Sequence, residues 1–176
     1  MGSAFTTRSF EACLAEVGDA LLFAANDGTT GVELWRSDGS EAGTVLVRDI
    51  NPGSLPSMSA SNCPLSFVGI GESLFFRAND GAHGAELWRS DGTAAGTALV
   101  RDIAAGAAAS NPFCMAPVGG GVLFQAADAS TGAELWITDG TFAGTTQVAD
   151  IDPAGSSGPC GFASVGGVTL FRAFET

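Results

Sequence analysis

Hydrophobic and polar positions follow one pattern that recurs along the chain. In its second occurrence, a short apolar run at 65–68 is followed by a turn at 69–72 and a second apolar run at 74–78. An Asn-Asp-Gly turn then leads to a third run at 86–89, and an Asp-Gly-Thr turn precedes an alternating segment at 97–103. Short runs bounded by Gly, Asn and Asp predict β-strands joined by tight turns. Each unit is therefore expected to hold four antiparallel strands.

The same string of residues occurs three times in register. GVELWRSDGSEAGTVLVRDI begins at Gly31, GAELWRSDGTAAGTALVRDI at Gly84 and GAELWITDGTFAGTTQVADI at Gly132. A partial fourth copy, PCGFASVGGVTLFRA, begins at Pro159. A fixed period decides the architecture before any local assignment does. The repeat boundaries that we expect are 10–59, 60–110, 111–157 and, for the partial copy, 158–176, after an expression-derived or disordered leader at 1–9.

A four-stranded meander repeated roughly every fifty residues predicts a β-propeller, whose blades cover one another's faces. The expected fold class is all-β, a propeller-like array of three full blades and a half blade. The alternative is a β-solenoid, whose coils are usually shorter and parallel. With the Pro/Gly/Ser-rich connectors crossing from an outer strand to the next inner strand, we expect inner strands at 14–17, 65–68, 115–118 and 162–165, and outer strands that end at Ile50, Ile103 and Ile151.

The half blade leaves an unpaired strand edge at 169–174 and bare faces on the end blades. We therefore expect a homo-oligomer, most simply a dimer that closes a ring of seven or eight blades. The other explanation is that the chain is a fragment of a longer array.

The string ELWRSDGSEAGTVLVRDI resembles the repeat of the bacterial ELWxxDGT-repeat proteins, and the resemblance spans about residues 10–173. It implies propeller-like repeats in an extracellular or cell-surface protein, and it brings no catalytic residue. The third copy departs from the pattern, with Asp128-Ala129-Ser130 in place of the Asn-Asp-Gly turn. The leader MGSAFTTRS is not a signal peptide, but Met-Gly-Ser looks like an expression remnant and leaves the native location open.

Charge and hydropathy exclude several classes of partner. Seven basic residues face nineteen acidic ones, for a formal net charge of −12. A nucleic acid or an anionic lipid surface requires a basic face, so we expect neither. No apolar stretch is long enough to span a membrane, so we expect no membrane insertion.

One tryptophan recurs in each full copy, at Trp35, Trp88 and Trp136. These residues form either an aromatic platform for a ligand or the packing between blades. We favour a structural repeat core, because a ligand site rarely needs the same residue in every blade.

Acidic residues recur in the turns, and the weak candidates for a calcium site are Asp27, Asp38, Asp80, Asp91 and Asp139. Calcium takes roughly six to eight oxygen ligands. Each turn offers a single Asp, so we favour the interpretation that each carboxylate caps its own turn. No other cofactor is expected.

Further charged positions recur. Glu33 returns as Glu86 and Glu134, and Arg36 returns as Arg89. The pair Arg48-Asp49 returns as Arg101-Asp102, whereas Ala149 takes the place of the arginine before Asp150 in the third copy. The pattern predicts cross-strand ion pairs between blades.

One cysteine occurs in each unit, at equivalent places ahead of the inner strands: Cys13, Cys63, Cys114 and Cys160. Buried thiols and disulfides between neighbouring blades stay open as interpretations. A ring of thiolates around a soft metal is the weakest, because the spacing is unlike that of CxxC motifs.

Catalysis has few candidate residues. His83 is the only histidine, and the other copies carry Thr30 and Thr131 at its place. We therefore expect no enzyme, but a scaffold or interaction module that binds protein or glycan or assembles with itself. The alternatives are a calcium-dependent adhesion or glycan-binding propeller and a secreted glycan-active enzyme of propeller type.

Overall fold

The computed structural model describes residues 13–53, 55–58 and 66–175. Sheet 1 contains β1 (Leu14–Val17), β2 (Ala20–Asn26), β3 (Val32–Ser37) and β4 (Val45–Arg48). Sheet 2 contains β5 (Phe67–Ile70), β6 (Ser73–Asn79), β7 (Ala85–Ser90) and β8 (Ala98–Arg101). Sheet 3 contains β9 (Phe113–Val118), β10 (Gly121–Asp128), β11 (Gly132–Thr138) and β12 (Thr146–Ala149). Sheet 4 contains β13 (Cys160–Val165) and β14 (Val168–Arg172).

Every sheet is an antiparallel meander, and neighbouring strands follow chain order. The described ranges contain no helix, and hence none that could cross a membrane. The all-β expectation, with three four-stranded sheets and one two-stranded sheet, is confirmed.

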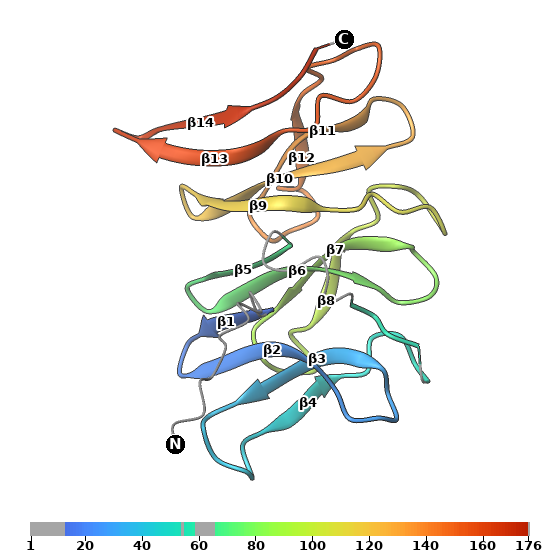
Figure 1. Ribbon diagram of the computed structural model, residues 1–176, viewed down its shortest axis with the longest axis vertical. Helices are drawn as coiled ribbons and strands as arrows, with labels where there is room; N and C mark the ends of the chain where they lie inside the picture. Colours follow the sequence, from blue (N-terminus) through green and yellow to red (C-terminus); the bar gives the residue numbers. More distant parts are fainter. Residues whose placement is uncertain (1–12, 54, 59–65, 176) are drawn as a thin grey trace, which may run out of the picture.

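The four sheets are stacked in chain order, with sheets 1 and 4 at opposite ends (Figure 1). Their first strands β1, β5, β9 and β13 lie against one another along one side of the stack. This is the arrangement expected of inner strands. For each sheet, we call the face toward the preceding sheet the front face and the face toward the following sheet the back face.

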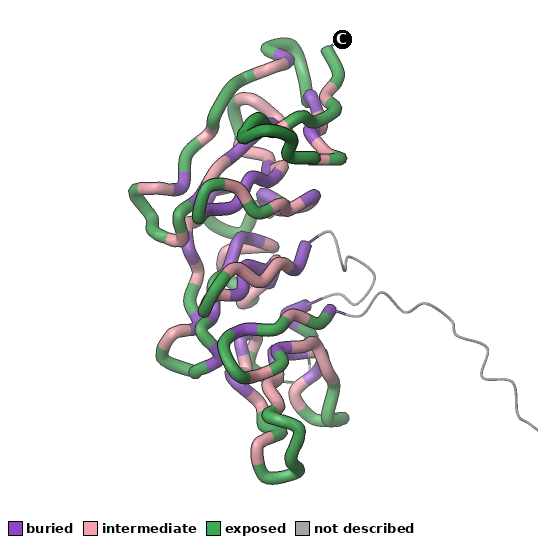
Figure 2. Tube along the Cα trace, turned by 90° about the vertical axis from the view of Figure 1, so that its left-hand side faces the viewer, coloured by how far each residue is buried: buried purple, intermediate pink, exposed green. Residues whose placement is uncertain are grey.

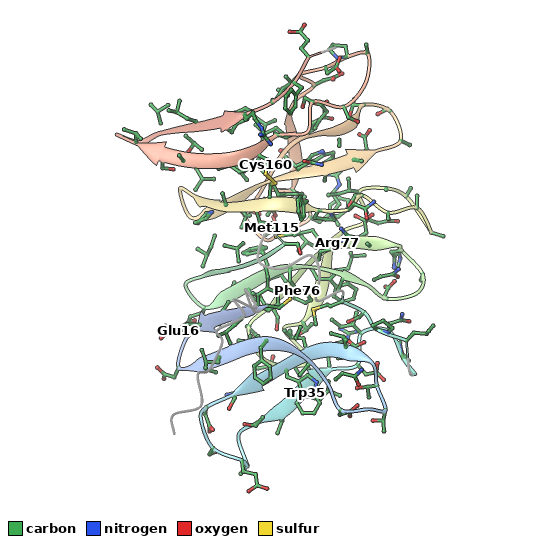
Figure 3. All side chains as sticks on the ribbon, viewed as in Figure 1. Glu16, Trp35, Phe76, Arg77, Met115 and Cys160 are labelled. Carbon is green, nitrogen blue, oxygen red and sulfur yellow. A yellow bond between two sulfur atoms is a disulfide. The ribbon has the colours of Figure 1, made fainter. Side chains whose placement is uncertain are left out.

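The core lies between the sheets rather than within any one of them. Leu22 and Leu34 on the back of sheet 1 pack against Phe76 and Trp88 on the front of sheet 2. A second cluster joins sheets 2 and 3 and includes Met115 at its margin. Figure 3 shows Phe76 in the first of these layers and Met115 in the second. Burial is accordingly concentrated between sheets, and exposed residues gather at both ends of the stack (Figure 2).

A β-bulge recurs between the third and fourth strands of the full sheets. Leu34 pairs with Arg48 while Trp35 pairs with Leu46, so Val47 is the extra residue. The same shift occurs in sheets 2 and 3. The bulge turns this valine toward the next sheet, and Val47 is buried in the core there.

The position of β5 differs from the sequence prediction of 65–68, because Gly69 lies inside the strand rather than in the turn. A Cβ on Gly69 would lie 2.9 Å from the carbonyl oxygen of Glu16, so this glycine permits the close approach of β1. Gly71, with φ of +57°, takes the turn instead. Leu65 lies outside the described residues.

The outer strands end two residues before the expected isoleucines, at Arg48, Arg101 and Ala149. The amide nitrogens of Ile50 and Ile103 donate to buried glutamate carboxylates instead of to a neighbouring strand. The strand therefore ends where the backbone amide donates to a glutamate carboxylate instead of to a neighbouring strand.

Candidate functional site: sheet interfaces and end faces

A buried glutamate in the third strand of each full sheet holds the connector that leads to the next sheet. In sheet 2, Glu86 accepts hydrogen bonds from the amide nitrogens of Ile103 (3.1 Å) and Ser110 (2.9 Å), and from the Ser110 hydroxyl (2.5 Å). Glu33 and Glu134 are held in the same way by the residues that correspond to these in sheets 1 and 3. We call this arrangement the glutamate clasp.

The clasp places carboxylates where water does not reach them, since all three glutamates are fully buried. Burial raises the pKa of Glu33 and Glu86, although the hydrogen bonds from the connector oppose the shift. The predicted ion pairs are wrong for these residues, because backbone and hydroxyl donors occupy the carboxylates. Sequence reasoning missed the serine partners Ser57, Ser110 and Ser157, which recur 24, 24 and 23 residues after the glutamates.

The arginines expected to form ion pairs make a different contact across each full interface. The guanidinium carbon of Arg48 lies 5.7 Å from the ring centroid of Trp88, and its Nη1 donates to the Thr97 carbonyl oxygen (2.5 Å). Arg101 repeats both contacts with Trp136 and Thr145 of sheet 3. Each arginine thus ties the outer strand of one sheet to the next sheet.

The tryptophans of the repeat differ in burial according to whether a sheet precedes them. Trp88 and Trp136 are buried within the cores between sheets. Trp35 is half-buried in sheet 1, which is the first sheet of the stack in the described part of the chain (Figure 3). The difference follows from packing, so the ring itself serves as a packing element in sheets 2 and 3.

Each aspartate that was a candidate calcium ligand caps its own turn. Asp27, Asp91 and Asp139 accept hydrogen bonds from amide and hydroxyl groups two or three residues later in the chain. Asp38 does the same with Ser40. The Ser and Thr donors lower the pKa of all four carboxyl groups. Among the described residues, no group of three or more His, Cys, Asp and Glu side chains is placed to share a metal ion.

Asp80 caps the fifth of these turns and also binds the single histidine. Its Oδ2 lies 2.8 Å from His83 Nδ1. This hydrogen bond, helped by the charge of Asp80, raises the pKa of His83. Burial raises the pKa of Asp80, but the hydrogen bonds from His83 and Ala82 outweigh this effect, so the pKa is lowered. The pair holds the turn between β6 and β7.

A disulfide joins sheets 3 and 4. Cys114 at the start of β9 is bonded to Cys160 at the start of β13, with the Cα atoms 5.2 Å apart (Figure 3). For this pair, the interpretation of a bridge between neighbouring units is confirmed. Cys13 is also disulfide-bonded, and Cys63 lies outside the described residues.

A shallow groove of about 300 Å³ runs between turns of sheets 1 and 2. It is lined by the carboxylates of Asp19, Glu72 and Asp91 and by the guanidinium of Arg36. The turn hydrogen bonds described above already hold Asp91.

The front face of sheet 1 is an exposed apolar surface. Leu14 and Leu21 are 49% and 43% exposed, and Phe23 beside them is half-buried. In sheet 2, Leu74 and Phe76 occupy the positions of Leu21 and Phe23 and are fully buried. Figure 2 shows this end of the stack as largely exposed.

The back face of sheet 4 is the second exposed apolar surface, at the other end of the stack (Figure 2). Val165, Val168 and Leu170 are 67%, 60% and 58% exposed. Leu22, which occupies the position of Leu170 in sheet 1, is fully buried against sheet 2. Exposed patches of this kind mark interaction surfaces.

Comparisons of the chain with protein-family models, with curated proteins and with solved structures found no match. Its role is therefore inferred from its own residues. They form two exposed apolar end faces on a stack whose recurrent glutamates hold the connectors and whose turn aspartates hold their own turns.

Proposed function

We propose that this chain is a non-catalytic repeat scaffold of propeller type that assembles with further copies of itself through its end faces. It is an interaction module of a secreted or cell-surface bacterial protein of the ELWxxDGT-repeat kind. The assembly presents a surface built from near-identical sheets.

The engagement of the polar groups supports a scaffold rather than an enzyme. The clasp glutamates accept hydrogen bonds from the connectors, and the turn aspartates accept them from their own turns. These carboxylates are held in almost the same way in each repeat, whereas catalysis normally needs a cluster of groups that differs from one repeat to the next.

The observation that carries the proposal is the exposure of both end faces. The same strand positions are buried in the interior of the stack and exposed at its two ends. Covering apolar area contributes roughly 25 cal/mol per Å², so a sheet that covers either face stabilises the assembly.

The disulfide between Cys114 and Cys160 supports the proposed location. Disulfides persist in oxidising compartments and are rare in the cytosol of mesophiles.

Sedimentation velocity on the oxidised chain, from sub-micromolar to high micromolar concentration, tests self-assembly. The proposal predicts a concentration-dependent shift from monomer to a dimer. A single species of monomer mass over the whole range would contradict it.

A further inference from the structure

The two end faces correspond to the two halves of an interface that the molecule already contains. We propose that the back face of sheet 4 in one copy docks on the front face of sheet 1 in a second copy, head to tail. The inference rests on the proposed function and specifies which surfaces meet.

The front face of sheet 1 carries the same residue pattern as the front faces of sheets 2 and 3, which the preceding sheet covers. In each full sheet, a phenylalanine of the second strand lies directly opposite the recurrent tryptophan: Phe23 in sheet 1, Phe76 in sheet 2 and Phe124 in sheet 3. Phe76 and Phe124 are fully buried by the back face of the preceding sheet. Phe23 therefore belongs to a surface built to receive a back face.

The back face of sheet 4 has the pattern of the back face that covers Phe76. In sheet 1, Leu22 lies opposite Ala15, and Ala20 lies opposite Val17. In sheet 4, Leu170 lies opposite Ala163, and Val168 lies opposite Val165. The register is the same, and three of the four side chains are identical in type.

The pairing of unlike faces selects the geometry of the assembly. Both interfaces between full sheets join a back face to a front face, and the first strands lie together in each. A contact of this kind between two copies is heterologous, and repeating it with a rotation that closes gives a ring. Two copies then supply eight sheets, six with four strands and two with two strands. This selects the eight-unit ring over the seven-unit ring.

Two features make the intermolecular contact weaker than the interfaces inside the chain. Glu16 occupies the position of Gly69, where β5 approaches β1 closely, so its side chain and charge obstruct the same approach to sheet 1. Figure 3 shows Glu16 on β1 in the end sheet. Sheet 4 has only two strands, so it can cover only the half of the front face that β1 and β2 form. The dimer is therefore expected to dissociate reversibly.

Two variants with one damaged face each distinguish head-to-tail docking from other arrangements. Leu21→Glu places a charge on the front face, and Leu170→Glu places one on the back face. Because every head-to-tail contact uses one face of each kind, each variant alone is expected to be monomeric. In a mixture, the intact back face of the first variant meets the intact front face of the second, so a mixed dimer forms.

Native mass spectrometry detects the mixed dimer if one variant is labelled with ¹⁵N, because both substitutions change the mass equally. Leu55→Glu is the matched control, since Leu55 is 63% exposed but lies in a connector. It is expected to dimerise as the wild type does. Val168→Glu gives a second back-face variant, and circular dichroism checks that each variant is folded.

The outcomes separate the inference from the proposed function. A wild-type chain that stays monomeric overturns self-assembly itself. A dimeric wild type with no mixed dimer, or a variant that still dimerises alone, overturns head-to-tail docking and leaves self-assembly standing. A mixed dimer formed from two monomeric variants is the result that the inference predicts.

Discussion

At the scale of single residues, the recurrent acidic side chains stabilise the fold in two ways. The glutamates are buried and hold connectors, whereas the aspartates are exposed or partly exposed and hold their own turns. The turn caps were predictable from sequence, because the side chain of an Asp in a turn commonly accepts hydrogen bonds from backbone amides two or three residues later. The clasp was not, because its partners lie 17 to 24 residues after the glutamate and become neighbours only when the connector folds back.

The clasp serine is expected to contribute measurably to stability. Ser110→Ala removes the hydroxyl that donates to Glu86 in the buried clasp. We expect the free energy of unfolding in urea to fall by about 2 kcal/mol, because a buried hydrogen bond to a charged group contributes roughly 1.5–3 kcal/mol. Ser130→Ala is the control, since Ser130 donates to Asp128 in an exposed turn. Equal losses in the two variants would argue against the clasp as a stabilising element.

The single histidine reports directly on its turn. Its pKa is raised above 6.5 by Asp80, so the pair contributes stability that is fully present below pH 6.5 and is lost as the pH rises through the folded pKa. We expect the Hε1 resonance of His83 to titrate above pH 6.5 in NMR spectra, and Asp80→Asn to return the midpoint toward 6.5. A midpoint at or below 6.5 in the wild type would show that the hydrogen bond is absent in solution.

Glu16 is expected to weaken the contact between copies. Glu16→Gly introduces the residue that sheet 2 carries at this position and removes a charge from the contact surface. We expect the dissociation constant of the dimer to fall by about tenfold, since a change of about 1.4 kcal/mol corresponds to that factor. Sedimentation equilibrium measures it, and weaker or unchanged association would count against Glu16 as the obstructing residue.

At the scale of elements, hydrophobic alternation and turn residues located the strands, and packing between sheets decided their ends. β1 was predicted with its observed bounds, because Val17 is followed at once by a glycine turn. β5 was displaced by two residues, because Gly69 serves a close contact with another sheet. That role of a glycine cannot be read from the local sequence, in which a turn is the simpler interpretation.

We expect the two-stranded sheet to depend on its covalent link. An isolated hairpin is marginally stable in water, and sheet 4 is joined to sheet 3 by the bond between Cys114 and Cys160. The variant with Cys114→Ser and Cys160→Ser is expected to lose amide-exchange protection in β13 and β14 while β6 and β7 keep theirs. Closing a loop of 46 residues contributes about 4 kcal/mol in the chain-entropy model, so the local loss should be large. Unchanged protection in β13 and β14 would show that packing alone holds the sheet.

At the scale of the whole molecule, the repeat explains both the stack and its exposed ends. A sheet with two apolar faces has to be covered twice, and the interior sheets of the stack meet that requirement. The end sheets each keep one face exposed, so the same pattern that builds the core leaves two surfaces for assembly. The sequence repeat predicted this requirement, but the match between the face of sheet 4 and that of sheet 1 needed the strand register.

Electron microscopy of the oxidised chain at a concentration where sedimentation finds the dimer tests the central claim most directly. Head-to-tail assembly of stacked sheets predicts closed rings of eight radial units, two of them narrower than the rest. Open arcs that hold the sheets of a single chain, or pairs of arcs joined through like faces, would contradict it.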